Sequence, residues 1–254
     1  MNQTLVISGG TRGIGRAIVK RFAKEGIDIA FTYNKSEEEA QNIEKELKKE
    51  YGIKAKGYKL NVLNPKDYKE LFSEIDNDFQ NIKYFISNAI ISGKSVAGGF
   101  APFMRLREKG LTNIYTATVL SFVYGAQEAA KRMEVIGGGS ILALSSTGNK
   151  VYTPNYAGHG SSKAALEIMV KYAATELGGS GIRVNAISGG PIDTDALRAF
   201  PNYEEVKAEV IKRASIKRLG SVEDMADAAF FICSNEAGWI SGEVLTIDGR
   251  SSFK

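Results

Sequence analysis

A tyrosine, a lysine and a pair of serines are the residues of this chain that could act together as a catalytic group. Tyr156 and Lys163 are seven residues apart, about two turns if a helix begins near Pro154, and Ser145 and Ser146 follow an apolar run just before them. A nearby ammonium lowers the pKa of a phenol, which makes it a better proton donor or oxyanion partner near neutral pH. A tyrosine and a lysine alone indicate no more than an amphipathic helix. Whether they form a catalytic group therefore depends on the motifs in the rest of the chain.

Short apolar runs alternate with amphipathic segments along the chain. Buried strands are predicted at residues 4–8, 28–33, 54–60, 84–87, 140–144, 183–187 and 244–247. The clearest helices are predicted at residues 37–51, 111–134, 155–178 and 222–233. This alternation over 254 residues predicts a single α/β domain with a Rossmann-type, doubly wound parallel sheet.

Composition and charge exclude several classes of protein. The chain has no apolar run of the roughly 18 residues that would indicate a membrane span, and its start lacks a secretory signal. Cys233 is the only cysteine, which predicts a reducing, cytoplasmic location without disulfides. The net charge of +4 is too small, and its lysines too scattered, to favour nucleic acid. We expect a soluble protein without a metal site.

A glycine-rich turn follows the first predicted strand and opens the first predicted helix. Glycine permits unusual backbone angles and close approach of a phosphate, and a helix N-terminus presents unpaired N–H groups and a positive dipole end. The position of the turn therefore predicts dinucleotide binding. The residues expected to bind are Gly9, Thr11, Arg12, Gly13, Ile14 and Gly15.

The end of the second predicted strand indicates which dinucleotide binds. A carboxylate there would bond the ribose 2′-hydroxyl of NAD and repel a 2′-phosphate. The sequence has Asn34, Lys35 and Ser36 instead, and the first acidic residue is Glu37. Together with Arg12, these residues favour NADPH. The alternative is that Lys35 and Ser36 only cap the following helix.

Five segments in order, over nearly the whole chain, resemble motifs of the short-chain dehydrogenase/reductase superfamily. They are the glycine turn, the Asn88 segment, Ser146 with Tyr156 and Lys163, the Pro191 segment, and the Asp248-Gly249 ending. The resemblance implies further contacts with the cofactor. The residues concerned are Asn61, Val62, Asn88, Ala89, Lys163, Pro191, Ile192 and Thr194.

The spacing of the catalytic group indicates a subgroup. Most members of the superfamily place the tyrosine four residues before the lysine, where this chain has His159. A tyrosine seven residues before the lysine resembles the enoyl-acyl-carrier-protein reductases, and Ser146 suits their NADPH-dependent FabL type. The segments most like that type are residues 155–167, 184–190, 192–197 and 200–202.

The resemblance implies a mechanism, namely reduction of trans-2-enoyl thioesters during fatty acid biosynthesis. Tyr156 would donate to the enolate oxygen, Lys163 would hold the nicotinamide ribose, and Ser146 would complete the catalytic group. Moving the phenol three residues along a helix shifts it by about 4.5 Å, which fits a reaction at the β-carbon rather than the carbonyl carbon.

The remaining expectations concern two segments near the substrate, a carrier protein and the oligomeric state. Residues 94–110 show no regular pattern and are expected at the mouth of the substrate pocket. Residues 193–215 are expected to form a substrate lid, and the basic residues around 198–218 suit an acyl carrier protein that brings the substrate. The resemblance also implies a homotetramer.

Two other functions stay open at this point. The first is a carbonyl reductase, such as a 3-oxoacyl-acyl-carrier-protein reductase, with Tyr156 or His159 as the proton donor. The second is a non-catalytic NADPH-binding regulator, because Ile90, Thr118 and His159 depart from the common pattern of the family.

Overall fold

The computed structural model describes residues 2–91, 93–198 and 203–252. Within these residues, the strands form one seven-stranded parallel sheet with the order β3-β2-β1-β4-β5-β6-β7. The strands are β1 (Thr4–Ser8), β2 (Asp28–Tyr33), β3 (Ala55–Lys59), β4 (Ile82–Ser87), β5 (Gly139–Ser146), β6 (Ile182–Gly189) and β7 (Val244–Ile247). The order reverses between β1 and β4, so the predicted doubly wound sheet is confirmed.

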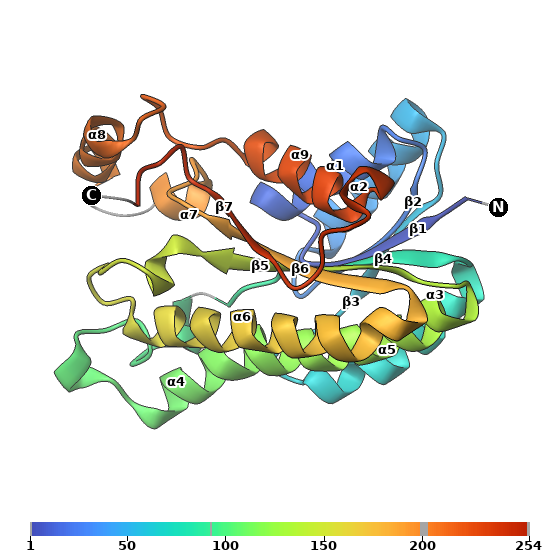
Figure 1. The fold of residues 1–254 in the computed structure, drawn as a ribbon, viewed down its shortest axis with the longest axis horizontal. Helices are drawn as coiled ribbons and strands as arrows, with labels where there is room; N and C mark the ends of the chain where they lie inside the picture. Colours follow the sequence, from blue (N-terminus) through green and yellow to red (C-terminus); the bar gives the residue numbers. More distant parts are fainter. Residues whose placement is uncertain (1, 92, 199–202, 253–254) are drawn as a thin grey trace.

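Helices cover both faces of this sheet. In Figure 1, α1, α2 and α9 lie above it and α3, α4, α5 and α6 below it, while α7 and α8 lie at the end near the C-terminus. Among the described residues, every helix is too short or too polar to cross a membrane. The helices are α1 (Gly13–Ala23), α2 (Glu37–Tyr51), α3 (Tyr68–Asp78), α4 (Glu108–Tyr115), α5 (Ser121–Val135), α6 (Ala157–Leu177), α7 (Asp195–Arg198), α8 (Tyr203–Arg213) and α9 (Val222–Cys233).

Strand β1, third in the sheet, is buried along its whole length because helices cover both of its faces. Side chains of a strand alternate between faces. Leu5 and Ile7 therefore pack in the core shared with α1, α2 and α9, and Val6 packs in the core shared with α3, α5 and α6. Two apolar layers thus fix the sheet between the helices.

Aromatic packing joins α1 to α9. The Phe22 ring lies edge-on to Tyr84 and to Phe230, with centroids 5.4 and 5.3 Å apart. Helix α9 begins at a capping box in which the Ser221 hydroxyl accepts from the Asp224 N–H and the Asp224 carboxylate accepts from the Ser221 N–H. These contacts place α9 over the sheet, beside α1.

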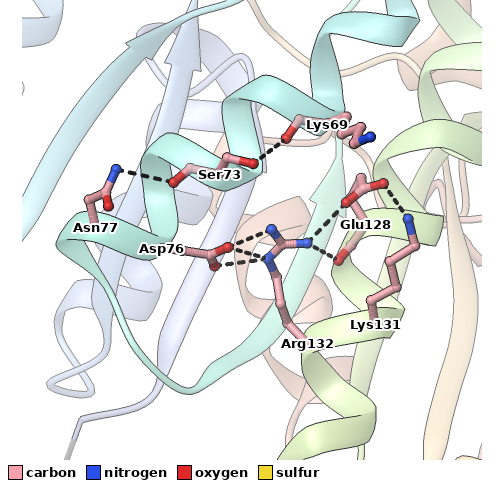
Figure 2. A network of polar contacts seen from close by, with 7 residues as sticks. All are labelled: Lys69, Ser73, Asp76, Asn77, Glu128, Lys131 and Arg132. Carbon is pink, nitrogen blue, oxygen red and sulfur yellow. Dashed lines mark hydrogen bonds and ion pairs between the residues drawn. The ribbon is translucent and has the colours of Figure 1, made fainter.

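On the opposite face, a polar network ties α3 to α5. Figure 2 shows Arg132 between the carboxylates of Asp76 and Glu128. Its Nε lies 2.8 Å from Asp76 Oδ1 and its Nη1 lies 3.0 Å from Glu128 Oε2, while its guanidinium lies over the Phe72 ring. Lys131 adds a bond to Glu128 from the exposed side. Arg132 therefore satisfies a buried carboxylate and joins two helices.

Two predicted helix starts are wrong. Helix α6 begins at Ala157, because Asn155 has the left-handed φ of 62° and separates Pro154 from the helix. Helix α4 begins at Glu108 rather than at residue 111, and a π-helical turn (Thr116–Leu120) joins it to α5. The turn contains Thr118, one of the three residues that depart from the common pattern of the family, and its side chain is buried.

Candidate active site

Tyr156 lies at the last position before α6. Its carbonyl accepts the Gly160 N–H at 2.7 Å, which makes it the first acceptor of the helix. The phenol ring packs on the short turn after β5, where a Cβ at Gly148 would lie 2.6 Å from Tyr156 Cε1. Gly148 thus allows the turn to approach the ring closely and fixes where the phenol lies.

Ser146 ends β5 next to this turn, and its hydroxyl accepts the Gly148 N–H at 3.2 Å. The Tyr156 ring packs on Gly148, so the structure brings the predicted serine and tyrosine to the same turn. Burial raises the pKa of Tyr156, while the nearby Ser146 side chain acts in the opposite direction. The prediction of a lowered phenol pKa is therefore wrong, because burial disfavours the phenolate. The phenol is protonated at neutral pH and can donate a hydrogen bond.

Lys163 lies two turns into α6 with its side chain buried. Its Nζ donates to the Leu144 carbonyl of β5 at 2.5 Å. Burial lowers the pKa of Lys163 to about 8, and the negative charge of Glu167 opposes that change. The helix and the end of β5 therefore hold an ammonium close to the Ser146 and Tyr156 pair.

His159 has a different environment from that of a proton donor. Its ring stacks on the Tyr156 ring, with centroids 5.2 Å apart and an angle of 26° between the planes. Phe100, from the segment 94–110 that is expected at the mouth of the pocket, lies edge-on to both rings. Burial and the charge of Lys163 lower the pKa of His159 to about 4. The imidazole is thus neutral at physiological pH, so it lacks the imidazolium proton that a general acid would donate.

The glycine turn has the close contacts that its sequence predicts. Gly9 has a φ of +76°, and a Cβ at Gly15 would lie 1.9 Å from the Gly9 carbonyl oxygen. The Asn88 amide donates to the carbonyls of Ser8 and Gly9 at 3.0 and 2.8 Å. The Ser8 hydroxyl accepts the N–H groups of Asn88 and Ala89. Asn88 and Ala89, both predicted to contact the cofactor, therefore hold the turn in shape.

The residues predicted at the adenosine end are exposed around the start of α1 and the end of β2. Arg12, Asn34, Lys35 and Ser36 all face solvent. Ser36 makes no side-chain capping bond to α2, which removes the main support for a purely capping role. The predicted adenine contacts lie after β3, where the Asn61 carboxamide accepts the Leu63 N–H at 3.1 Å and Val62 is buried.

The Pro191 segment reaches the same end of the sheet because Gly189 of β6 pairs in register with Ser146 of β5. Ile192 then forms a bridge with Gly220, and the Thr194 hydroxyl accepts the Leu197 N–H at 3.3 Å. Helices α7 and α8 follow in the region predicted as a lid. Residues 200–202, part of the FabL-like segments, lie outside the described residues.

These features fit a dinucleotide. Helix α1 has neither an acidic residue in its first turn nor a side-chain cap, so its N–H groups suit a phosphate. Three buried side-chain atoms without a partner lie near the carboxyl ends of β5, β6 and β7, among the described residues: Asn149 Oδ1, Ser188 Oγ and Ser251 Oγ. Unsatisfied polar atoms at a ligand edge of an open α/β sheet are expected where a polar ligand binds.

The fold and this site define a dinucleotide-binding α/β protein of the reductase class. A family model described as enoyl-(acyl carrier protein) reductase matches residues 9–249. The chain belongs to the short-chain dehydrogenase/reductase superfamily, a family of oxidoreductases.

Individual relatives agree with this family. The chain is 35% identical over 253 residues to the 1-cyclohexenylcarbonyl-CoA reductase of Streptomyces collinus. The alignment covers 99% of this chain and 87% of that protein. It is 27% identical to the 3-oxoacyl-[acyl-carrier-protein] reductase FabG of Staphylococcus epidermidis, with 98% of each chain covered. A blue fluorescent protein from a metagenomic library, solved in complex with NADPH, has a TM-score of 0.88 at 26% identity, covering 98% of this chain and 97% of that one.

Some residues around the site were not predicted from the sequence. Phe100 and Gly148 contact the Tyr156 ring, and Glu167 lies one helical turn beyond Lys163. A sequence signal existed for Glu167, because residues four apart share a helix face. Phe100 lies in a segment without periodicity, and no local signal indicates its contact.

Proposed function

We propose that this protein is an NADPH-dependent enoyl-acyl-carrier-protein reductase of the FabL type, which reduces trans-2-enoyl thioesters. The observation that carries the proposal is the position of Tyr156 at the start of α6, with its ring packed on Gly148 in the turn that Ser146 opens. Tyr156 is a protonated phenol, whereas the pKa of His159 is about 4, so an acid at the position common in the family is missing at neutral pH.

The chain's own groups suit the proposed chemistry. When bound, the nicotinamide supplies a hydride, which would add to the β-carbon of the substrate. Negative charge then develops on the thioester oxygen, and the Tyr156 hydroxyl would donate a hydrogen bond to it. Ser146 would orient that hydroxyl. The Lys163 ammonium, held by the Leu144 carbonyl, would bind the ribose hydroxyls and add a positive charge beside the developing oxyanion.

The relatives support thioester reduction and leave two candidates. The name of the Streptomyces collinus relative contains a 1-cyclohexenylcarbonyl thioester. That compound carries its double bond next to the carbonyl, as an enoyl thioester does. The description of the matching family model also supports enoyl reduction. The FabG relative favours the second candidate, reduction of 3-oxoacyl thioesters.

NADPH is the proposed cofactor because exposed Arg12 and Lys35 flank the expected position of the 2′-phosphate, and no carboxylate occupies residues 34–36. The NADPH complex of a structural neighbour supports this choice. Strong use of NADH in place of NADPH by the native protein would contradict it.

An acyl carrier protein is the proposed carrier of the substrate. A cavity of about 510 Å³ under α8 is bordered by Lys207, Lys217 and Arg218, with Asp193 as the acidic residue. Exposed cations steer acidic partners, and steering weakens as salt increases. Catalytic efficiency on carrier-bound substrate should therefore fall with salt more steeply than on coenzyme A thioester. Equal salt slopes would contradict the carrier.

We also propose a cytoplasmic homotetramer. Ile168, Met169 and Tyr172 form an exposed apolar row on α6, and such a surface is unusual in a monomer. Sedimentation should show a tetramer for the native chain and a smaller species for Ile168→Glu. A native monomer would contradict the proposal.

The decisive assay compares catalytic efficiency on crotonyl and acetoacetyl thioesters, each with NADPH and with NADH. Enoyl reduction predicts NADPH consumption with the crotonyl thioester and little with the acetoacetyl thioester. The opposite ranking would favour the carbonyl reductase. NADPH binding without turnover of either substrate would favour the regulator.

A further inference from the structure

Glu167 lies on α6 one turn beyond Lys163, and its carboxylate reaches the same end of β5. The Ser145 hydroxyl donates to Glu167 Oε1 at 2.6 Å, while the preceding carbonyl, that of Leu144, accepts from Lys163 at 2.5 Å. Two adjacent residues of β5 thus bind two residues of α6 that are one turn apart. Ser145 is buried and Glu167 is partly exposed, so this contact lies at the edge of the buried region.

Among the described groups around Lys163, the Glu167 carboxylate is the one that can stabilise its positive charge. Burial of an ammonium is costly unless opposite charge or hydrogen bonds stabilise it. Of the groups described around Lys163, His159 is neutral at physiological pH and Leu144 offers only a carbonyl. Glu167 is the group whose negative charge favours the ammonium, and it raises the Lys163 pKa against the lowering by burial.

We propose that Glu167 is a positioning residue that keeps buried Lys163 charged and, through Ser145, holds α6 against the end of β5. The part that concerns catalysis rests on the proposed function, since it assumes that the Lys163 ammonium serves the reaction. The part that concerns charge is a property of the protein alone and can be tested without substrate.

The first experiment measures the Lys163 pKa in the cofactor-free protein. Lysine labelled with ¹³C at Cε is titrated by NMR, and the Lys163 resonance is assigned with Lys163→Met. Glu167→Gln removes the charge but keeps an acceptor for Ser145, so we expect the Lys163 pKa to fall by about one unit, a tenfold change in proton affinity. Glu176→Gln, an exposed glutamate on the same helix, is the matched control and should cause no change.

Further variants keep this test decisive. Ser145→Ala removes the hydrogen bond but leaves the charge, and should lower the pKa less than Glu167→Gln does. Glu167→Asp retains the charge and should keep most of the native Lys163 pKa. If Glu167→Gln fails to fold, the Lys163 pKa in Glu167→Asp is compared with that in Ser145→Ala. An unchanged Lys163 pKa in Glu167→Gln, or an equal fall in Glu167→Asp, would overturn the proposal.

The second experiment measures catalytic efficiency against pH, with whichever thioester the enzyme reduces. Loss of the ammonium above its pKa should end activity, so the alkaline limb of the Glu167→Gln profile should move about one unit to lower pH. At a pH above the native limb, the variant should be about tenfold slower than the native protein. A pKa shift without this movement would overturn the catalytic part alone. Failure of enoyl reduction itself would leave the NMR result intact.

Discussion

Burial acts on three neighbouring side chains of the site with different chemical results. A buried group favours its neutral form. The pKa of Tyr156 therefore rises and the phenol keeps its proton, while the pKa of His159 falls to about 4 and the imidazole loses its proton. Lys163, with a pKa of about 8, remains mostly charged at neutral pH because Glu167 opposes the effect of burial. One physical cause thus supports the proposal that Tyr156 is the donor.

Tyr156→Phe should lower turnover by about 10² or more, because the phenol is the proposed hydrogen-bond donor to the developing oxyanion. The ring and its packing on Gly148 are retained, so the variant should still bind NADPH. Stopped-flow turnover and cofactor fluorescence measure the two quantities. His159→Ala is the control and should cost much less; if it costs more than Tyr156→Phe, the carbonyl reductase with a histidine donor becomes the better assignment.

His159 should make the protein sensitive to mild acid. Its folded pKa of about 4 is below the ordinary value of 6.5, so the unfolded state binds the proton first as pH falls between these values. Native stability therefore decreases in this window, by about 2 kcal/mol at pH 4.5. His159 is the only histidine, which makes the comparison clean. Urea unfolding of the native protein and of His159→Phe at pH 7 and 4.5 should show the larger loss in the native protein. Equal losses would contradict the buried neutral imidazole.

At the scale of elements, the glycine turn depends on contact between backbone atoms. Gly15→Ala would place a methyl group 1.9 Å from the Gly9 carbonyl, so the turn must move away from α1. We expect at least a tenfold loss of NADPH affinity, since the N-terminus of α1 no longer faces the phosphate properly. Gly179→Ala is the control because a Cβ there meets nothing within 4 Å. Fluorescence titration measures both variants, and native affinity in Gly15→Ala would contradict a cofactor site at this turn.

The tie between α3 and α5 should contribute to stability rather than to catalysis. Burial alone would raise the Glu128 pKa, but hydrogen bonds from Lys131 and Arg132 outweigh it and lower the pKa. Arg132→Met leaves Asp76 and the buried Glu128 without their shared partner, and should cost about 2 kcal/mol in urea unfolding. Lys131 is exposed, so Lys131→Met should cost under about 0.5 kcal/mol. Equal costs would show that the tie in Figure 2 contributes little.

Local patterns predicted the regular elements well. The bounds of β1, β2, β7, α2 and α9 agree with the predictions, because each has clear apolar periodicity and a clear stop signal. Gly52, for example, ends α2 with a left-handed φ of 69°. The start of α6 was wrong because Asn155 has a left-handed φ, which non-glycine residues adopt rarely and which no apolar pattern indicates. The direction of the Tyr156 pKa was wrong because burial is set by the tertiary structure and not by the spacing to Lys163.

At the scale of the whole molecule, parallel strands collect distant residues at one edge. The glycine turn after β1, Asn88 after β4, Ser146 at the end of β5 and the Pro191 segment after β6 all lie where strands end at their carboxyl side. The sequence could predict this gathering because the parallel direction of the strands follows from the alternation of strands and helices. It could not predict which groups touch, such as Ser145 with Glu167, because those contacts depend on how α6 is seated on β5.

The most direct test of enoyl reduction follows the hydride. The protein is supplied with NADPH carrying deuterium at C4 and with an equimolar mixture of crotonyl and acetoacetyl thioesters, and the products are analysed by mass spectrometry and NMR. The proposed arrangement of Tyr156 and Lys163 predicts butyryl thioester with deuterium at its β-carbon and little 3-hydroxybutyryl thioester. Deuterium found mainly in 3-hydroxybutyryl thioester, with the crotonyl thioester unchanged, would contradict it.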